Sequence, residues 1–147
     1  MPDVTISPEV RDFLLTGTRT AKLATVREDG RPHVVPIWIQ LDGNEIVFNT
    51  GKRSIKALNM QRDPRVCLCV DDEQPPFGFV LIEGTIHFSD EPDELLTWAT
   101  RIGGRYMGED LAEAYGKRNS VPGEFLVRLA PTKVIFKTGV ASFTDGV

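Results

Sequence analysis

The sequence predicts a mainly β, single-domain fold over residues 1–147, an antiparallel β-barrel with peripheral helices. Six or seven stretches of β-branched and apolar residues are separated by mostly short turns. The helical stretches are brief, and they do not alternate regularly with the strands as they do in a doubly wound sheet. Closure into a barrel is a common way for antiparallel strands to avoid exposed edges. We therefore expect strands that enclose one hydrophobic core.

The N-terminal part predicts a short helix followed by a β-hairpin. Ser7-Pro8-Glu9 suits a helix start, because serine caps the first turn, proline fits it and an acidic residue is favoured there. The first strand runs over 20–26. Asp29-Gly30 is a tight turn, since Asp-Gly accepts the positive φ that hairpins require. The second strand, 32–41, is interrupted by Pro36, which predicts an edge or a bulge there.

The middle of the chain predicts three strands and one short helix between them. The turn before the first of these strands is Asp42-Gly43-Asn44. The helix ends at Asp63-Pro64, because the residue before proline disfavours the helical conformation. Gly84 lies inside the longest strand and indicates a bulge or a bend. The predicted strands are 45–49, 65–71 and 78–88, and the predicted helix is 54–62.

The C-terminal part predicts two helical stretches and two closing strands. An acidic cluster at 89–94 marks a helix start, and apolar residues follow it at helical spacing. Gly103-Gly104 is expected to break or bend this helix, and a second helical stretch covers 110–115. The last two strands, 123–129 and 132–137, lie on either side of a proline.

Charge and hydropathy argue against several classes of protein. The formal net charge of −4 is unfavourable for a general nucleic-acid binder, because phosphate contacts require a basic surface. No apolar run approaches the ~18 residues that a membrane span needs. Met1-Pro2-Asp3-Val4 lacks the basic and apolar parts of a signal peptide. We expect a cytoplasmic protein with a small-molecule partner and without nucleic-acid or membrane partners.

Histidine and cysteine usage gives little support to metal or triad chemistry. The two histidines, His33 and His87, are far apart in the sequence. Cys67 and Cys69 alternate in an apolar stretch, so both thiols point to one face of a strand, and we expect core cysteines. Dinucleotide and P-loop glycine signatures are absent. We expect no metal site, and if the chain is an enzyme, an organic cofactor carries the difficult chemistry.

The junction at 49–56, where a strand ends and a helix begins, carries the functional signal. Thr50 and Ser54 offer hydroxyl groups, and Lys52 and Lys56 place positive charge four residues apart. Backbone donors at a helix start, beside cations, form a phosphate site. From these residues alone, a solvated basic helix is the simpler interpretation.

Trp38 allows two interpretations as well. An aromatic residue in a strand is more often a core or interface residue than a cofactor contact. Its position two residues after Pro36, in an interrupted strand with free backbone groups, favours contact with a ligand.

Three segments between Leu23 and Val70 are specific enough to indicate a family. They are the hairpins LATVREDGRPHVVPIWIQLDGNEIVFNT, the cluster Lys52-x-Ser54-x-Lys56 and the segment 59–66. Together they resemble the pyridoxamine 5′-phosphate oxidase-like split β-barrel family. Within that family the chain is most similar to the small branch that uses the deazaflavin coenzyme F420. The resemblance covers nearly the whole chain, from the N-terminal helix to the strand near Val134.

The resemblance implies a homodimer with two cofactor sites at its interface. It places the flavin or deazaflavin ring against the second and third strands, at Val35, Pro36, Ile37, Trp38, Asn49 and Thr50. It places the cofactor phosphate at the following helix start, at Lys52, Ser54 and Lys56. FMN-using oxidases carry adjacent Arg and Lys where this chain has Ile55 and Lys56, which weakens the case for FMN.

The resemblance therefore implies a deazaflavin-dependent oxidoreductase that passes a hydride between reduced coenzyme F420 and a small-molecule acceptor. An FMN-binding oxidoreductase on the same fold is the alternative. A non-enzymatic carrier of a flavin or haem-type ligand is a third hypothesis. The sequence identifies neither the acceptor nor a catalytic side chain, and few ionisable groups are present for acid–base catalysis.

Overall fold

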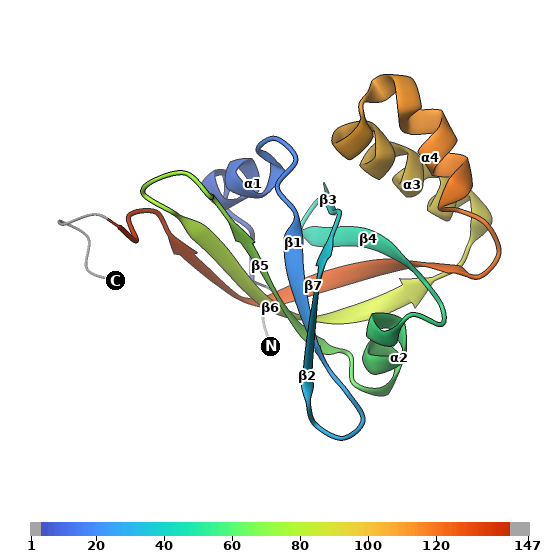
Figure 1. Ribbon diagram of the computed structural model, residues 1–147, viewed down its shortest axis with the longest axis horizontal. Helices are drawn as coiled ribbons and strands as arrows, with labels where there is room; N and C mark the ends of the chain where they lie inside the picture. Colours follow the sequence, from blue (N-terminus) through green and yellow to red (C-terminus); the bar gives the residue numbers. More distant parts are fainter. Residues whose placement is uncertain (1–3, 142–147) are drawn as a thin grey trace.

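Seven strands form one antiparallel sheet, in the order β2-β1-β5-β6-β7-β4-β3, in the computed structural model, which describes residues 4–141 (Figure 1). The sheet curls into a split barrel, so the predicted mainly β fold class is confirmed. The strands are β1 (Ala21–Val26), β2 (Pro32–Ile37), β3 (Gln40–Asp42), β4 (Glu45–Gly51), β5 (Arg65–Asp71), β6 (Phe79–Ser89) and β7 (Glu124–Lys137).

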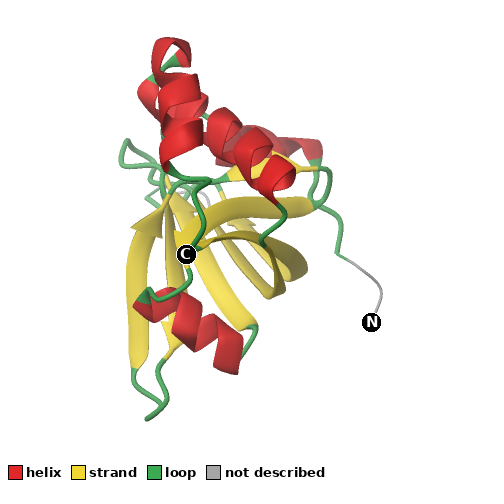
Figure 2. Cartoon of the chain, turned by 90° about the vertical axis from the view of Figure 1, so that its right-hand side faces the viewer, coloured by secondary structure: helices red, strands yellow, loops and turns green. Residues whose placement is uncertain are grey.

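Helical segments pack around this sheet. In Figures 1 and 2 the α3–α4 pair lies on one side of the sheet and α2 on the other. The segments are α1 (Pro8–Leu15), α2 (Ile55–Arg62), α3 (Pro92–Met107), the 3₁₀ turn η1 (Glu109–Leu111) and α4 (Ala112–Arg118). The predicted start of the first helix is confirmed, because the Ser7 Oγ accepts a hydrogen bond from Val10 N at 3.2 Å.

The core lies inside the barrel, lined by alternate residues of each strand. Leu23 of β1 and Leu68 of β5 are opposite one another in register and both are buried. The helix α2 is tied to this core by a buried polar contact, since Asn59 Nδ2 donates to Thr25 Oγ1 at 3.0 Å. Both side chains are satisfied by that bond, which removes the cost of burying them alone.

The predicted second strand is divided, and the break is not at Pro36. β2 continues through Pro36 to Ile37, and β3 begins at Gln40. Pro36 is tolerated because β2 lies at the edge of the sheet, where a missing backbone donor breaks no ladder. The interruption is at Trp38 and Ile39 instead.

The bulge predicted at Gly84 is confirmed, but the two predicted closing strands are one. The register between β6 and β7 shifts at Glu83/Gly84, opposite Pro131, and leaves Thr132 unpaired. A Cβ at Gly84 would lie 2.6 Å from Leu129 Cδ2, so glycine is required where the strands approach. β7 therefore passes its proline at the bulge and continues to Lys137.

The expected break at Gly103-Gly104 is wrong. α3 runs without interruption through both glycines to Met107. Their role is close packing: a Cβ at Gly103 would lie 2.6 Å from Tyr115 Cβ, and one at Gly104 would lie 3.2 Å from Ala112 Cβ. The missing side chains let α4 approach α3.

Cys67 and Cys69 share one face of β5, as predicted, but the face is the outer one. Val66, Leu68 and Val70 point into the barrel, and the two free thiols are half-buried on the opposite side. Partial burial raises the pKa of both thiols. The expectation of core cysteines is therefore corrected.

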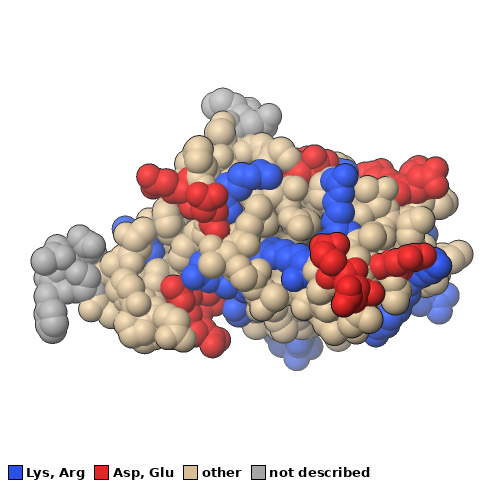
Figure 3. Space-filling view, turned by 90° about the horizontal axis from the view of Figure 1, so that it is seen from above, with Lys and Arg blue, Asp and Glu red and all other residues tan. Residues whose placement is uncertain are grey.

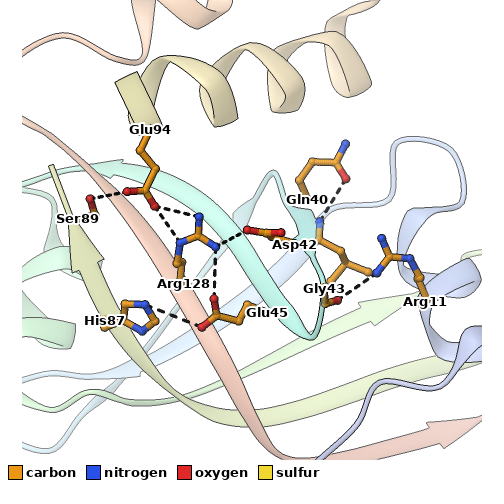
Figure 4. A network of polar contacts seen from close by, with 10 residues as sticks. Arg11, Gln40, Asp42, Gly43, Glu45, His87, Ser89, Glu94 and Arg128 are labelled. Atoms are coloured by element: carbon orange, nitrogen blue, oxygen red, sulfur yellow. Dashed lines mark hydrogen bonds and ion pairs between the residues drawn. The ribbon is translucent and has the colours of Figure 1, made fainter. Parts of the chain in front are cut away.

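A charged cluster around Arg128 joins β7 to the β3–β4 hairpin and to α3 (Figure 4). The guanidinium Nη1 lies 2.8 Å from Asp42 Oδ2 and 3.3 Å from Glu45 Oε1. Its Nε and Nη2 donate to Glu94 Oε1 at 3.0 and 2.9 Å. The cluster holds the hairpin and the helix α3 in place beside the site described below.

Two surface properties complete the fold. Acidic and basic side chains intermingle on the face seen from above, rather than gather by sign (Figure 3). None of the helices within residues 4–141 has the length and apolarity needed to cross a bilayer.

Candidate functional site

A cavity of about 330 Å³ opens where the β2–β3 break, the end of β4, the start of α2 and the end of α4 meet. One wall is largely apolar and the opposite end carries hydroxyl and charged groups. The lining residues are Pro36, Ile37, Trp38, Asn49, Thr50, Gly51, Ser54, Lys56, Arg118, Asn119 and Glu124.

The apolar wall is held from behind by the last turn of α3. The Trp38 indole stacks on the Tyr106 ring, with centroids 5.1 Å apart and planes 6° from parallel. The Tyr106 hydroxyl donates to Arg19 O at 2.8 Å and accepts from Ile39 N at 3.1 Å. The neighbouring Arg105 donates to Ile39 O at 2.7 Å. The break between the strands is thus a fixed structure.

The polar end begins at the helix α2. Ser54 Oγ caps this helix by accepting from Ala57 N at 3.1 Å, and it lies 2.8 Å from Thr50 Oγ1. The two hydroxyls share one hydrogen between them, so one hydroxyl hydrogen stays available to an acceptor in the cavity. A helix start and a free hydroxyl donor suit an anionic oxygen.

Three charged side chains face this end of the cavity: Lys56, Arg118 and Glu124. Burial lowers the pKa of Lys56, against the opposing effect of the nearby Glu124 carboxylate. Burial likewise raises the pKa of Glu124, opposed by Lys56 and Arg118. Partial removal from water therefore disfavours the charged form of both groups, which an anionic ligand would relieve for Lys56.

Seven of the nine predicted site residues line this one cavity, namely Pro36, Ile37, Trp38, Asn49, Thr50, Ser54 and Lys56. The other two lie elsewhere. Val35 packs against the core. Lys52 turns away from Lys56 into an adjacent hollow, where its Nζ pairs with Asp90 Oδ2 at 2.8 Å and lies over the Phe125 ring.

Sequence reasoning missed the residues that α4 and β7 contribute. Arg118 and Asn119 reach the cavity from the end of α4, and Asn119 O accepts from Asn49 Nδ2 at 3.2 Å. Glu124 pairs in register with Gly51. Some 70 residues separate these groups from the β4–α2 junction, and no local pattern marks such a contact.

The site has no concentration of metal ligands. Among residues 4–141, no group of three or more His, Cys, Asp or Glu side chains is placed to hold a metal ion. Neither histidine lines the cavity. The donor set of hydroxyls, one ammonium and one guanidinium suits a phosphate ester better than a metal.

Solved structures of other proteins share this architecture. A conserved hypothetical protein from Mycobacterium tuberculosis is 27% identical, with a TM-score of 0.77 over 92% of this chain and 87% of that one. An F420 reductase is 26% identical, with a TM-score of 0.69 over 88% and 98%. The heme storage protein HutZ from Vibrio cholerae is 17% identical, with a TM-score of 0.71 over 94% and 99%, and shares the fold.

The fold and the cavity define a split β-barrel with a combined apolar and anion-binding site. The sequence profile of the pyridoxamine 5′-phosphate oxidase family matches residues 6–138. The chain belongs to that family. The family includes oxidoreductases and typically binds flavins such as FMN.

Proposed function

We propose that the protein is a deazaflavin-dependent oxidoreductase, which binds coenzyme F420 in the cavity between β2, β4, α2 and α4. The observation that carries this proposal is the joining, in one cavity, of an apolar wall to an anion-binding end. A phosphate-bearing ring cofactor needs both parts. The F420 reductase of similar fold, 26% identical over 88% of this chain, adds support for the deazaflavin over FMN.

The apolar wall would hold the ring. Pro36, Ile37 and Trp38 present backbone and an aromatic side chain whose orientation is fixed by the stack on Tyr106. A fixed wall positions a bound ring without reorganisation, which is how this site would contribute to rate. When bound, reduced deazaflavin supplies a hydride from C5 of its ring.

The polar end would hold the phosphate. Ser54 and Thr50 offer one free hydroxyl hydrogen, and Lys56 and Arg118 offer charge from opposite sides of the cavity. Lys52 was predicted in the same role, but its ion pair with Asp90 points it into the adjacent hollow. We therefore assign phosphate binding to Ser54, Lys56 and Arg118, and leave Lys52 as a prediction.

We also propose that the protein is a homodimer. The outer face of β2, β1 and β5 carries a half-buried apolar stripe of Ala24, Cys67 and Cys69 beside Val34, whose exposed fraction is 64%. Pro36 lies on this same face and also lines the cavity, so a second copy seated there would border the site. Light scattering after gel filtration tests the dimer. The cytoplasmic location stays a prediction.

Fluorescence titration tests the cofactor. Purified protein is titrated with oxidised coenzyme F420 and, in parallel, with FMN and haemin. Saturable quenching by F420 at micromolar concentration, with much weaker binding of FMN, is the expected result. Tighter binding of FMN would move the protein to the alternative function, and tight binding of haemin alone would make it a carrier.

A further inference from the structure

One carboxylate lies among the cations of the anion-binding end. Glu124 begins β7, pairs in register with Gly51 and lines the cavity together with Lys56 and Arg118. Among residues 4–141, none of these three side chains has an ion-pair partner within 4.0 Å or a side-chain hydrogen bond. An acidic residue at this position weakens the attraction for any anion, and it has no structural bond that explains it.

We propose that Glu124 makes the cavity selective for phosphodiesters over phosphomonoesters. Two cations and one carboxylate give the polar end a net charge of one positive unit. A phosphodiester carries one negative charge and is matched by that unit. A phosphomonoester carries a second negative charge near neutral pH, which would meet the carboxylate without a cation to balance it.

This selectivity would act through differential repulsion rather than through an extra contact. Both ester types can accept from the hydroxyl hydrogen at Thr50 and Ser54 and can pair with Lys56. The carboxylate repels the doubly charged group more strongly, in proportion to its charge, and the half-buried site screens that repulsion less than open water does. Such a repulsive element is a common way to reject a close analogue.

The inference rests on the proposed function, because the phosphate of coenzyme F420 is a diester and that of FMN is a monoester. It explains how a chain in a family that typically binds FMN would prefer the deazaflavin. It also gives the preference to a residue from β7, far in sequence from the helix start that binds the phosphate.

The test compares the wild-type protein with Glu124→Gln, which keeps the shape of the side chain and removes its charge. Each is titrated with FMN, with riboflavin, with coenzyme F420 and with the phosphate-free deazaflavin ring of F420. The ratio of Kd values within each pair isolates the contribution of the phosphate. Glu113→Gln on α4 is the charge-matched control, because Glu113 is exposed and lies outside the cavity lining.

We expect Glu124→Gln to tighten FMN about tenfold relative to coenzyme F420, with riboflavin unchanged. The control should keep the wild-type ratios. An unchanged ratio in Glu124→Gln, or an equal gain for riboflavin, would overturn the selectivity while leaving the proposed cofactor intact. Failure of the wild-type protein to bind any of the four compounds would overturn the proposed function and the inference together.

Discussion

The Trp38 indole and the Tyr106 ring are stacked, with centroids 5.1 Å apart and planes 6° from parallel, although 68 positions separate them. Trp38 belongs to the break between β2 and β3, and Tyr106 to the last turn of α3. Since the Tyr106 hydroxyl also bonds Ile39 N and Arg19 O, one side chain sets both the backbone of the break and the plane of the indole. The apolar wall of the cavity depends on this contact.

Removal of that hydroxyl should destabilise the fold. Tyr106→Phe keeps the stack but leaves the buried Ile39 N without a partner, so the free energy of unfolding should fall by about 1–3 kcal/mol. Tyr115→Phe is the matched control, because Tyr115 also contacts Trp38 but makes no side-chain hydrogen bond within residues 4–141. Urea unfolding of both variants measures the difference. Equal midpoints would contradict the bridging role.

Lys56→Met should stabilise the protein and weaken its ligand. Burial holds the pKa of Lys56 below its ordinary value of 10.5, so the unfolded chain binds more protons between the two values. At neutral pH the buried charge therefore costs stability, a few tenths of a kcal/mol after solvent screening. Thermal unfolding should show a higher Tm for the variant, with the gain shrinking as pH rises toward the ordinary value.

The same variant should lose about tenfold or more in affinity for a phosphate-bearing cofactor, because a charge-assisted contact is removed. Lys133→Met is the control, since Lys133 is exposed on β7 at a distance from the cavity lining. A variant that bound coenzyme F420 and FMN as tightly as wild type would remove Lys56 from the site.

Arg128→Met should destabilise the protein in a pH-dependent way. Only 14% of the Arg128 side chain is exposed, and its loss leaves Asp42, Glu45 and Glu94 facing one another without a cation. We expect a loss of about 1–3 kcal/mol at pH 7, below the full cost of a buried broken pair because the carboxylates are partly exposed. The loss should shrink as pH falls and the carboxylates protonate.

Arg65→Met provides the comparison for this cluster. Its ion pair with Asp63 is at the surface, with 81% of the Arg65 side chain exposed. Exposed pairs contribute little, so its effect should stay within about 0.5 kcal/mol. Chemical unfolding at pH 7 and pH 4 separates the two variants. Equal losses would show that the Arg128 cluster is no more than a surface network.

Local patterns were sufficient to predict most of the elements of the fold. The cap at Ser7, the helix stop at Asp63-Pro64 and the bulge at Gly84 follow from the chemistry of single residues, and the structure contains all three. The wrong predictions came from tertiary context. Gly103-Gly104 reads as a break until α4 packs on it, and Pro36 reads as one until β2 lies at a sheet edge.

The site divides along the same line. Residues of 36–38 and 49–56 could be predicted, because they lie on two short stretches with recognisable chemistry. Arg118, Asn119 and Glu124 could not, because register and helix packing bring them there from the far end of the chain. The opposite directions of Lys52 and Lys56 were also beyond the sequence, since Asp90 attracts Lys52 away.

The close packing of α3 and α4 should be required for both stability and binding. A Cβ at Gly116 would meet the Oγ1 of Thr100 and would lie 3.0 Å from its Cβ. Gly116→Ala should therefore destabilise by about 1–3 kcal/mol, although Gly→Ala usually stabilises a helix. Thr100→Ala removes the obstructing Oγ1, so the double variant should recover about 1 kcal/mol or more of the loss.

This cycle also separates packing from the site, because Gly116 lies two residues before Arg118 on α4. A displaced α4 carries Arg118 away from Lys56, so Gly116→Ala should weaken cofactor binding and the double variant should restore it. Urea unfolding and a cofactor titration on the same four proteins give both readouts. Additive losses in stability would contradict the contact between Gly116 and Thr100, and unchanged affinity in Gly116→Ala would detach Arg118 from ligand binding.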